Sequence, residues 1–292
     1  MTRCGVPTRR SPGGLSRAIA EAAAALAHAG IDSARRDAEE LAAHLIGTER
    51  GRLALVDPPV RTFYAEYRRL VDARARRVPL QHLTGTASFG SVTLHVGPGV
   101  FVPRPETEAL LAWALAEDLP DSPTVIDACT GSGALALALA RHRPTARVFG
   151  IEICESALAY ARRNGADSPV QWVQADIATP GLLAELDGAV DLVVANPPYL
   201  PEGASLTPEV ADHDPRHALF AGSDGMAVIG AVTARAGSWL RPGGRFAVEH
   251  DDSTAGATVE LIAHTGLFDT IVSRRDLAGR PRFVTARRKV SR

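Results

Sequence analysis

The stretch TVIDACTGSGALALALA, Thr124–Ala140, combines the features that decide the fold. It begins with a short apolar run rich in β-branched residues, which is typical of a buried strand. A turn with two glycines, Gly131 and Gly133, comes next, and the leucine- and alanine-rich segment after it predicts a helix. A strand, a glycine-rich turn and a helix in this order predict the first unit of a parallel sheet.

The alternation of strand and helix continues towards the C-terminus. It runs through Arg147–Ile151, Glu155–Asn164, Val170–Ile177 and Ala189–Ala195. After a loop-rich stretch we expect a helix over 226–240 and strands over 244–250, 268–274 and 282–288, the last two as an antiparallel pair. The sequence therefore predicts an α/β fold with helices on both faces of a mostly parallel sheet. Right-handed crossovers would place the carboxyl ends of the strands, and the ligand site, along one edge.

The chain before this sheet has a different pattern. From Ser16 to about Val78 apolar residues recur at helical spacing, which predicts a small helical domain. ASFGSVTLHV, Ala87–Val96, alternates around Gly90 and predicts a β-hairpin. We therefore expect a disordered tail at 1–14, a helical domain at 15–84, a hairpin linker at 85–104 and the α/β domain at 105–292.

Composition argues against several classes of protein. The 292 residues carry 32 Lys and Arg against 33 Asp and Glu, so the basic excess of proteins that grip long nucleic acids is missing. Cys4, Cys129 and Cys154 are too few and too scattered for a disulfide framework or a zinc site. No window has the apolar length of a membrane helix, and the basic opening has no apolar segment of a secretory signal. We expect a cytoplasmic protein without membrane contact.

The glycine-rich turn indicates a ligand but does not identify it alone. Gly131 and Gly133 allow a tight turn and a close backbone approach, so the following helix N-terminus can face a polar or anionic group. The turn lacks the third glycine of the dinucleotide fingerprint, because Ala136 stands there, and it lacks the Lys-Ser/Thr of a phosphate-binding loop.

Acidic residues stand at the next two predicted strand ends. Glu152 lies about twenty residues beyond the glycines, where a carboxylate can accept hydrogen bonds from ribose hydroxyls. Asp176 ends the third strand and is placed to meet the exocyclic amine of an adenine. Each feature is unremarkable alone, but the series in this order predicts a nucleoside-containing cofactor.

The fourth strand ends in NPPY, Asn196–Tyr199. A planar amide or aniline-like nitrogen has a delocalised lone pair, so a protein that alkylates it must hold its N–H groups and stack on its plane. The Asn196 side-chain oxygen and the Pro197 carbonyl can accept those N–H groups, and proline fixes the backbone that aims the carbonyl. Tyr199 can supply a flat face. The alternative is that Asn-Pro-Pro is only a turn that ends the strand.

These motifs together resemble a class I methyltransferase that uses S-adenosylmethionine to methylate an exocyclic or amide nitrogen. The segments PLQHLTGTASFGSVTLHVGPGVFVPRPETEALL, Pro79–Leu111, and DHDPRHALFAGSDGM, Asp212–Met226, make the chain similar to the HemK/PrmC family of protein-(glutamine-N5) methyltransferases. The similarity runs from about Leu15 to Arg288. Members of that family methylate the glutamine of the GGQ motif in class-1 peptide chain release factors, so the resemblance implies that substrate here.

The resemblance also implies roles for individual residues. It implies that the cofactor is bound by Phe101, Arg104, Asp127, Thr130, Gly131, Gly133, Glu152, Asp176 and Asn196. The glutamine amide would be held by Asn196, Pro197, Pro198 and Tyr199. Glu106 and Thr107 would shape the rim of the substrate channel. Asp251 stands where the family more often has glycine, so the substrate channel can differ in shape from that of other members at this position.

Several alternatives stay open at this point. The acceptor can instead be a ribosomal-protein glutamine, or an exocyclic amine of rRNA or DNA flipped into the pocket. A non-catalytic adaptor that binds a translation factor is a further reading. We expect a monomer with no metal and no direct nucleic-acid contact, and surface or supporting roles for His213, His217 and His250.

Overall fold

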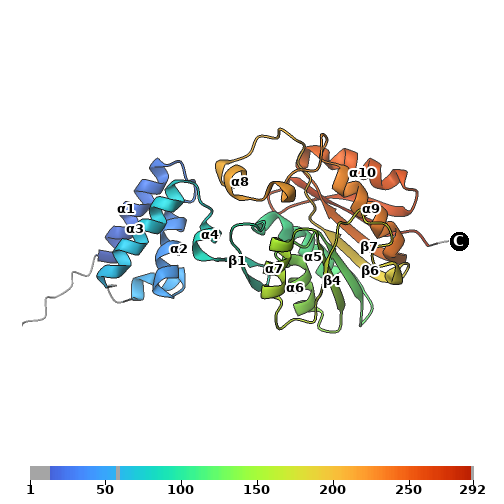
Figure 1. Ribbon diagram of the computed structural model, residues 1–292, viewed down its shortest axis with the longest axis horizontal. Helices are drawn as coiled ribbons and strands as arrows, with labels where there is room; N and C mark the ends of the chain where they lie inside the picture. The colour runs from blue at the N-terminus through green and yellow to red at the C-terminus, as the bar shows by residue number, and fades with distance from the viewer. Residues whose placement is uncertain (1–13, 57–59, 291–292) are drawn as a thin grey trace, which may run out of the picture. The chain divides into compact units, whose positions relative to one another are not determined.

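The computed structural model describes residues 14–56 and 60–290, and the chain divides into two compact units, Met1–Gly85 and Thr86–Arg292 (Figure 1). The expected disordered tail lies outside the described residues, apart from Gly14, which begins the first helix. The hairpin that the sequence predicts as a linker is the first part of the second unit.

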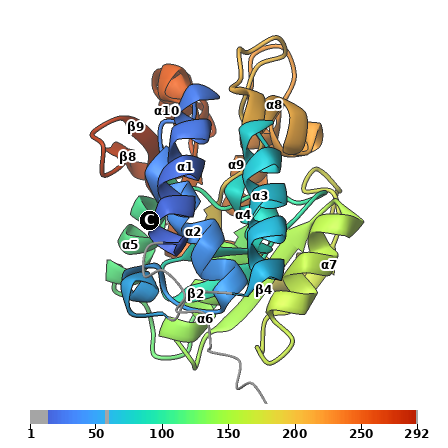
Figure 2. The same cartoon turned by 90° about the vertical axis from the view of Figure 1, so that its left-hand side faces the viewer.

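The first unit is a bundle of helices with its own core. Its elements are α1 (Gly14–His28), α2 (Ala34–Ile46), the short 3-10 helix η1 (Arg50–Leu55), α3 (Arg61–Ala75) and α4 (Leu80–Thr84) (Figure 2). Leu26, Ala38 and Leu41 are completely buried between the helices. Arg74 and Asp37 form a buried ion pair at 2.7 Å, which joins α3 to α2. The helical pattern predicted for this region is therefore confirmed.

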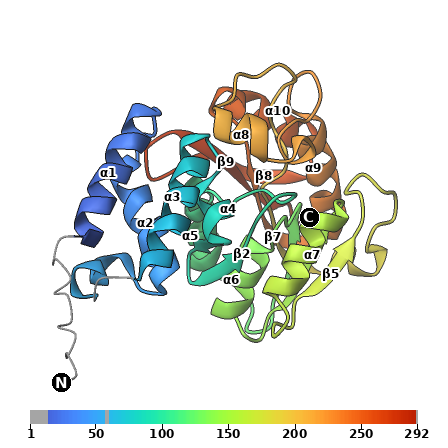
Figure 3. The ribbon, with the colours of Figure 1, turned by 60° about the vertical axis from the view of Figure 1, so that its left-hand side comes forward.

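The second unit is built on a seven-stranded sheet. Its strands are β3 (Thr124–Ala128), β4 (Arg147–Glu152), β5 (Gln171–Gln174), β6 (Val190–Ala195), β7 (Leu240–Glu249), β8 (Phe268–Arg275) and β9 (Pro281–Arg288). They lie in the order β5-β4-β3-β6-β7-β9-β8. Figure 3 labels β5, β7, β8 and β9 of this sheet. The first five pair in parallel, whereas β9 is antiparallel to both β7 and β8. The predicted parallel sheet and its antiparallel edge pair are confirmed. A separate hairpin, β1 (Thr86–Phe89) and β2 (Val92–His95), precedes the sheet.

Helices cover both faces of the sheet because its strands are apolar on both sides. Along β3, Val125 packs into the cluster that holds α5 (Glu108–Ala116) and α6 (Ala134–His142). The next residue, Ile126, packs into the opposite cluster, which holds α9 (Ala227–Trp239) and α10 (Ala255–His264). Two further helices, α7 (Glu155–Asn164) and α8 (Pro208–His213), complete the α-helices described in this unit. No helix in residues 14–56 and 60–290 has the length and apolar character needed to cross a bilayer.

Three glycines make room for the ring of Trp172 on β5. A Cβ on Gly133, Gly150 or Gly165 would lie 2.8, 2.5 or 2.7 Å from the nearest atom of that ring. These glycines begin α6, lie within β4 and follow α7. One aromatic side chain therefore packs where three elements approach closely, next to the glycine-rich turn.

We expect Gly150→Ala to lower the free energy of unfolding by about 1–3 kcal/mol, because the added methyl group overlaps the Trp172 ring. Gly256→Ala is the control, since Gly256 is exposed in α10 and has nothing within 4 Å of its Cβ position. That change should be neutral or stabilising by up to about 1 kcal/mol through helix propensity. Urea unfolding followed by circular dichroism measures both, and equal stabilities of the two variants would contradict the packing role of Trp172.

Candidate active site

A cavity of about 740 Å³ opens at the carboxyl ends of the parallel strands. Of the residues expected to bind the cofactor or the glutamine amide, those that line it are Phe101, Arg104, Asp127, Thr130, Gly131, Glu152, Asp176, Asn196, Pro197, Pro198 and Tyr199. Gly133 does not line the cavity. Its φ of +87° and its contact with Trp172 place it at the start of α6, where it shapes the turn from behind.

Asp127 holds the glycine-rich turn against the helix that follows. Its side chain is 1% exposed, and its Oδ2 accepts hydrogen bonds from the Thr130 hydroxyl at 2.5 Å and the Ala136 N–H at 3.0 Å. Desolvation raises the pKa of Asp127 to about 7, although these two hydrogen bonds act in the opposite direction and lower it. Gly131 in this turn has φ +57°, which glycine adopts without strain.

Glu152 is fixed in one orientation by main-chain donors. Its Oε2 accepts the N–H of Gly131 and its Oε1 accepts the N–H of Cys154, both at 2.9 Å. A carboxylate oxygen has a second lone pair, so the side chain can still accept hydroxyl groups from a ligand in the cavity. Asp176 lies at the end of the neighbouring strand and accepts the Ala178 N–H at 2.8 Å.

Ile153 also lines the cavity, although sequence reasoning missed it. Its side chain is 56% exposed, directly after Glu152. An exposed apolar side chain beside a ribose-type acceptor suits the flat face of a nucleobase. The available signal was an apolar residue just beyond an acidic strand end.

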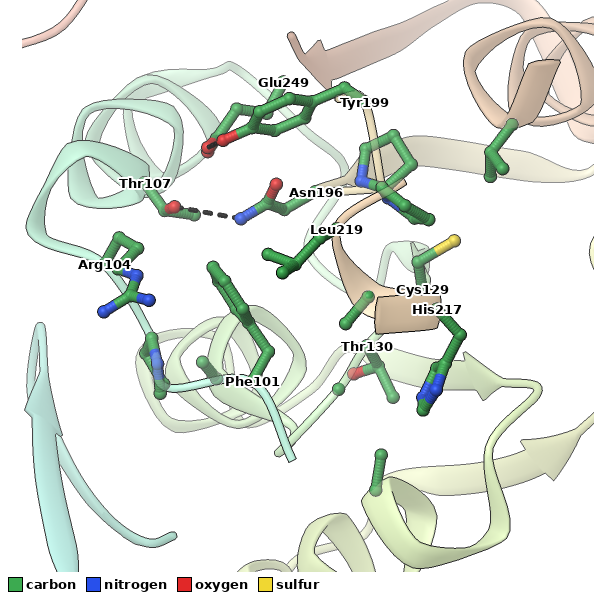
Figure 4. Close-up of a pocket in the computed structure, with 18 of the residues that line it drawn as sticks. Phe101, Arg104, Thr107, Cys129, Thr130, Asn196, Tyr199, His217, Leu219 and Glu249 are labelled. Atoms are coloured by element: carbon green, nitrogen blue, oxygen red, sulfur yellow. Dashed lines mark hydrogen bonds between the residues drawn. The ribbon is translucent and has the colours of Figure 1, made fainter. Parts of the chain in front are cut away.

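Asn196 and Tyr199 are held by side chains from distant parts of the chain (Figure 4). The Asn196 Nδ2 donates to the Thr107 Oγ1 at 3.1 Å, which leaves the Asn196 Oδ1 available as an acceptor. The Tyr199 hydroxyl donates to the Glu249 Oε1 at 3.1 Å. Glu106 and Thr107, expected to shape the rim of the channel, both line the cavity; Thr107 is 3% exposed and contacts Asn196 inside it.

The backbone around NPPY is anchored by the segment that follows it. The Leu200 N–H donates to the Leu219 carbonyl at 2.8 Å, and the Leu200 carbonyl accepts the Ala221 N–H at 2.9 Å. Gly225 has φ +75°, and a Cβ there would lie 2.2 Å from the Tyr199 carbonyl oxygen. The loop-rich stretch therefore packs back on the fourth strand end and fixes its geometry.

Arg104 lies over the ring of Phe101, with 4.8 Å between the guanidinium carbon and the ring centroid, and it forms an ion pair with Asp214. Both Phe101 and Arg104 line the cavity (Figure 4). Arg104 therefore keeps a cation and an aromatic face together at this wall of the site.

Two of the histidines considered from the sequence, His217 and His250, differ in whether they reach the cavity. His217 lines the cavity, whereas His250 is completely buried with its Nδ1 2.7 Å from the Asp251 carbonyl oxygen. Desolvation lowers the pKa of His250, so its ring is kept neutral. Of the two roles expected for His250, surface or supporting, its burial is consistent with the supporting one. Within residues 14–56 and 60–290, no group of His, Cys, Asp and Glu side chains is arranged to hold a metal ion.

The comparisons with known proteins agree with this geometry. Residues 17–85 match the PrmC N-terminal domain and residues 125–210 match a methyltransferase domain. The crystal structure of a methyltransferase from Pyrococcus furiosus has a TM-score of 0.52 at 17% identity and covers 75% of this chain and 99% of its own, which supports the fold. The fold and the cavity thus define a class I methyltransferase that uses S-adenosylmethionine.

Full-length relatives identify the family. The release factor glutamine methyltransferase of Mycobacterium tuberculosis (strain ATCC 25618 / H37Rv) is 65% identical over 94% of this chain and 91% of that protein. The one from Mycobacterium leprae (strain TN) is 62% identical over 95% and 98%. A 4-amino-L-phenylalanine/4-methylamino-L-phenylalanine methyltransferase of Streptomyces pristinaespiralis is 40% identical over 89% and 91%. The chain belongs to the release factor glutamine methyltransferase family.

We expect Glu152→Gln to weaken S-adenosylmethionine binding at least about tenfold. The carboxamide has one acceptor oxygen where the carboxylate has two, so either the Gly131 or the Cys154 N–H would face an NH₂ group. Glu155→Gln is the matched control, because Glu155 is an exposed residue at the start of α7 outside the cavity. Isothermal titration calorimetry gives both dissociation constants, and equal values for the two variants would exclude Glu152 from cofactor binding.

Proposed function

We propose that this chain transfers the methyl group of S-adenosylmethionine to the side-chain amide nitrogen of the glutamine in the GGQ motif of class-1 peptide chain release factors. The observation that carries the proposal is the Asn196 carboxamide. Its NH₂ group is bound by Thr107, so its oxygen is available to a substrate N–H at the end of β6.

The proposed mechanism follows from what an amide nitrogen needs. The Asn196 Oδ1 and the Pro197 carbonyl accept the two N–H groups of the glutamine amide, and Tyr199 covers its plane. These acceptors orient the weak nucleophile and stabilise the positive charge that develops on it. The cofactor, when bound, would supply a methyl group activated on a sulfonium, with the sulfur keeping the electrons of the broken C–S bond as the leaving group. The amide nitrogen, held by Asn196 and Pro197, would accept this methyl group and then lose a proton to water. No metal and no covalent enzyme intermediate take part.

A second acceptor is worth testing because of one relative. The Streptomyces pristinaespiralis protein is named for an arylamine substrate, and an aniline nitrogen is planar with a delocalised lone pair, as an amide nitrogen is. The higher identity to release factor glutamine methyltransferases, together with the PrmC N-terminal domain, favours the glutamine. A ribosomal-protein glutamine and an exocyclic amine of rRNA or DNA are the other acceptors to test.

The proposal includes how the partner is held. A GGQ loop consists mostly of small residues and cannot supply affinity alone, so the N-terminal unit and the stretch 201–224 would contact the release factor elsewhere. The balanced charge of the chain favours a protein partner over direct nucleic-acid contact. We propose that the chain acts as a monomer in the cytoplasm.

We expect Asn196→Ala to cut kcat for release factor methylation by about two orders of magnitude or more. This is the loss that removal of one preorganised hydrogen bond to a transition state typically causes. Its affinity for S-adenosylmethionine should stay within about twofold of the unaltered chain, because neighbouring cofactor contacts remain. Mass spectrometry of the release factor after incubation locates and counts the methyl group. A release factor with Ala in place of the GGQ glutamine is the control and should remain unmodified; full turnover by the Asn196 variant would remove this residue from the mechanism.

Deleting the residues up to about Val78 should raise KM for intact release factor while the shortened chain still binds S-adenosylmethionine. The docking contacts proposed for the first unit would be lost, whereas the cavity residues all lie in the second unit. Steady-state kinetics with the release factor as the varied substrate make the measurement. Unchanged KM and kcat would discard the docking role.

A further inference from the structure

Asn196 can point its carboxamide in two directions of nearly equal shape. In one, the oxygen is available to the substrate, and in the other the NH₂ group takes its place. Only the first orientation accepts an amide N–H, so the proposed function depends on what sets the direction. The structure places the Nδ2 on the Thr107 Oγ1 at 3.1 Å.

The direction of the Asn196 carboxamide depends in turn on which group accepts the Thr107 hydroxyl proton. Its hydroxyl has one proton to donate, and its oxygen already accepts from Asn196. Thr107 is 3% exposed, so water is not a ready acceptor for that proton. The carboxyl group beside it belongs to Glu249: its Oε1 accepts the Tyr199 hydroxyl, and its buried Oε2 has no other hydrogen-bond partner among the described residues. Desolvation raises the pKa of Glu249, and hydrogen bonds from Thr107 and Tyr199 oppose that rise. Figure 4 shows Glu249 beside Thr107 and the Tyr199 hydroxyl, across from Asn196.

We propose that Glu249 is a positioning residue that sets the direction of this hydrogen-bond chain and thereby the orientation of Asn196. A carboxylate can only accept, so the Thr107 and Tyr199 hydroxyl protons both point at it. The Thr107 oxygen is then committed to receiving the Asn196 N–H, and the Asn196 oxygen is left for the substrate. This inference rests on the role of Asn196 in the proposed function.

The direction depends on the charge of Glu249. Glu249 is 1% exposed, and desolvation raises its pKa to about 7. Above that pH it accepts both hydroxyl protons; below it, a protonated carboxyl can itself donate to Thr107, and the chain can reverse. We therefore expect kcat to fall as the pH drops below about 7. The charged or titratable groups around it are Arg282 on β9, Glu106 in the short 3-10 helix before α5, Tyr199 after β6, and the adjacent His250 and Asp251.

The test compares substitutions that preserve or abolish the direction of the hydrogen bonds from Thr107 to Glu249 and from Asn196 to Thr107. Glu249→Gln keeps the shape but allows an NH₂ group to donate to Thr107, so kcat should fall at least about tenfold, KM for S-adenosylmethionine should hold, and the acid limb near pH 7 should disappear. Thr107→Val should lower kcat similarly, whereas Thr107→Ser should restore it. The double variant Glu249→Gln with Thr107→Val should be no slower than the slower single variant. Glu260→Gln, exposed on α10, is the control and should match the unaltered chain.

Each result separates this inference from the proposed function. If Asn196→Ala is inactive but Glu249→Gln keeps full kcat across the pH range, the role of Glu249 is wrong and that of Asn196 stands. If the effects of Glu249→Gln and Thr107→Val multiply, Glu249 does not act through Thr107 and the inference is overturned. If Glu249→Gln does not fold, the Thr107→Val and Thr107→Ser pair decides: equal activity in those two overturns the inference, and rescue by serine supports it.

Discussion

The in-register parallel pairing of β4, β3 and β6 determines where the strand ends of the candidate active site lie. Ala128 pairs with Ile151 on one side and with Ala195 on the other. The next residues along these strands are therefore neighbours at one edge of the sheet, and they include Glu152 and Asn196. Four polar strand ends far apart in sequence form one cavity because parallel strands end together. A shift of one residue in any pair would turn its strand's core side chains to the opposite face.

Several acidic side chains lie in the wall of this cavity. Asp127, Glu152, Asp176 and Glu249 line it, and burial raises the pKa of Asp127 and of Glu249 to about 7. A raised pKa means that folding stability from these two groups is present at low pH and is lost as the pH rises towards 7. The positive sulfonium of S-adenosylmethionine favours the ionised carboxylates, so cofactor binding offsets this loss. Cofactor binding and the ionisation of the site are thus coupled by the same charges.

The sequence predicted the parts of the structure that local pattern controls. Strands, the glycine-rich turn and the NPPY end are each specified within a few residues, and the sheet rule then brings their ends together. Contacts between distant segments were not predictable. Thr107 meets Asn196 across 89 positions, and nothing local marks Gly133 as a neighbour of Trp172. Glu249 carried a weak signal, as a carboxyl group at the end of a buried strand. The sequence left a surface and a supporting role open for His250, and its burial is a property of the fold that its polar neighbours do not reveal.

The central claim is that the Asn196 Oδ1 and the Pro197 carbonyl hold the amide nitrogen that receives the methyl group. The most direct measurement is a crystal structure of the chain with S-adenosylhomocysteine and a release factor fragment carrying N5-methylglutamine. The account predicts that the methylated nitrogen lies within hydrogen-bond distance of at least one of these two oxygens, with the Asn196 Nδ2 on Thr107. A glutamine side chain bound away from NPPY, or an Asn196 that offers its NH₂ group to the substrate, would contradict it.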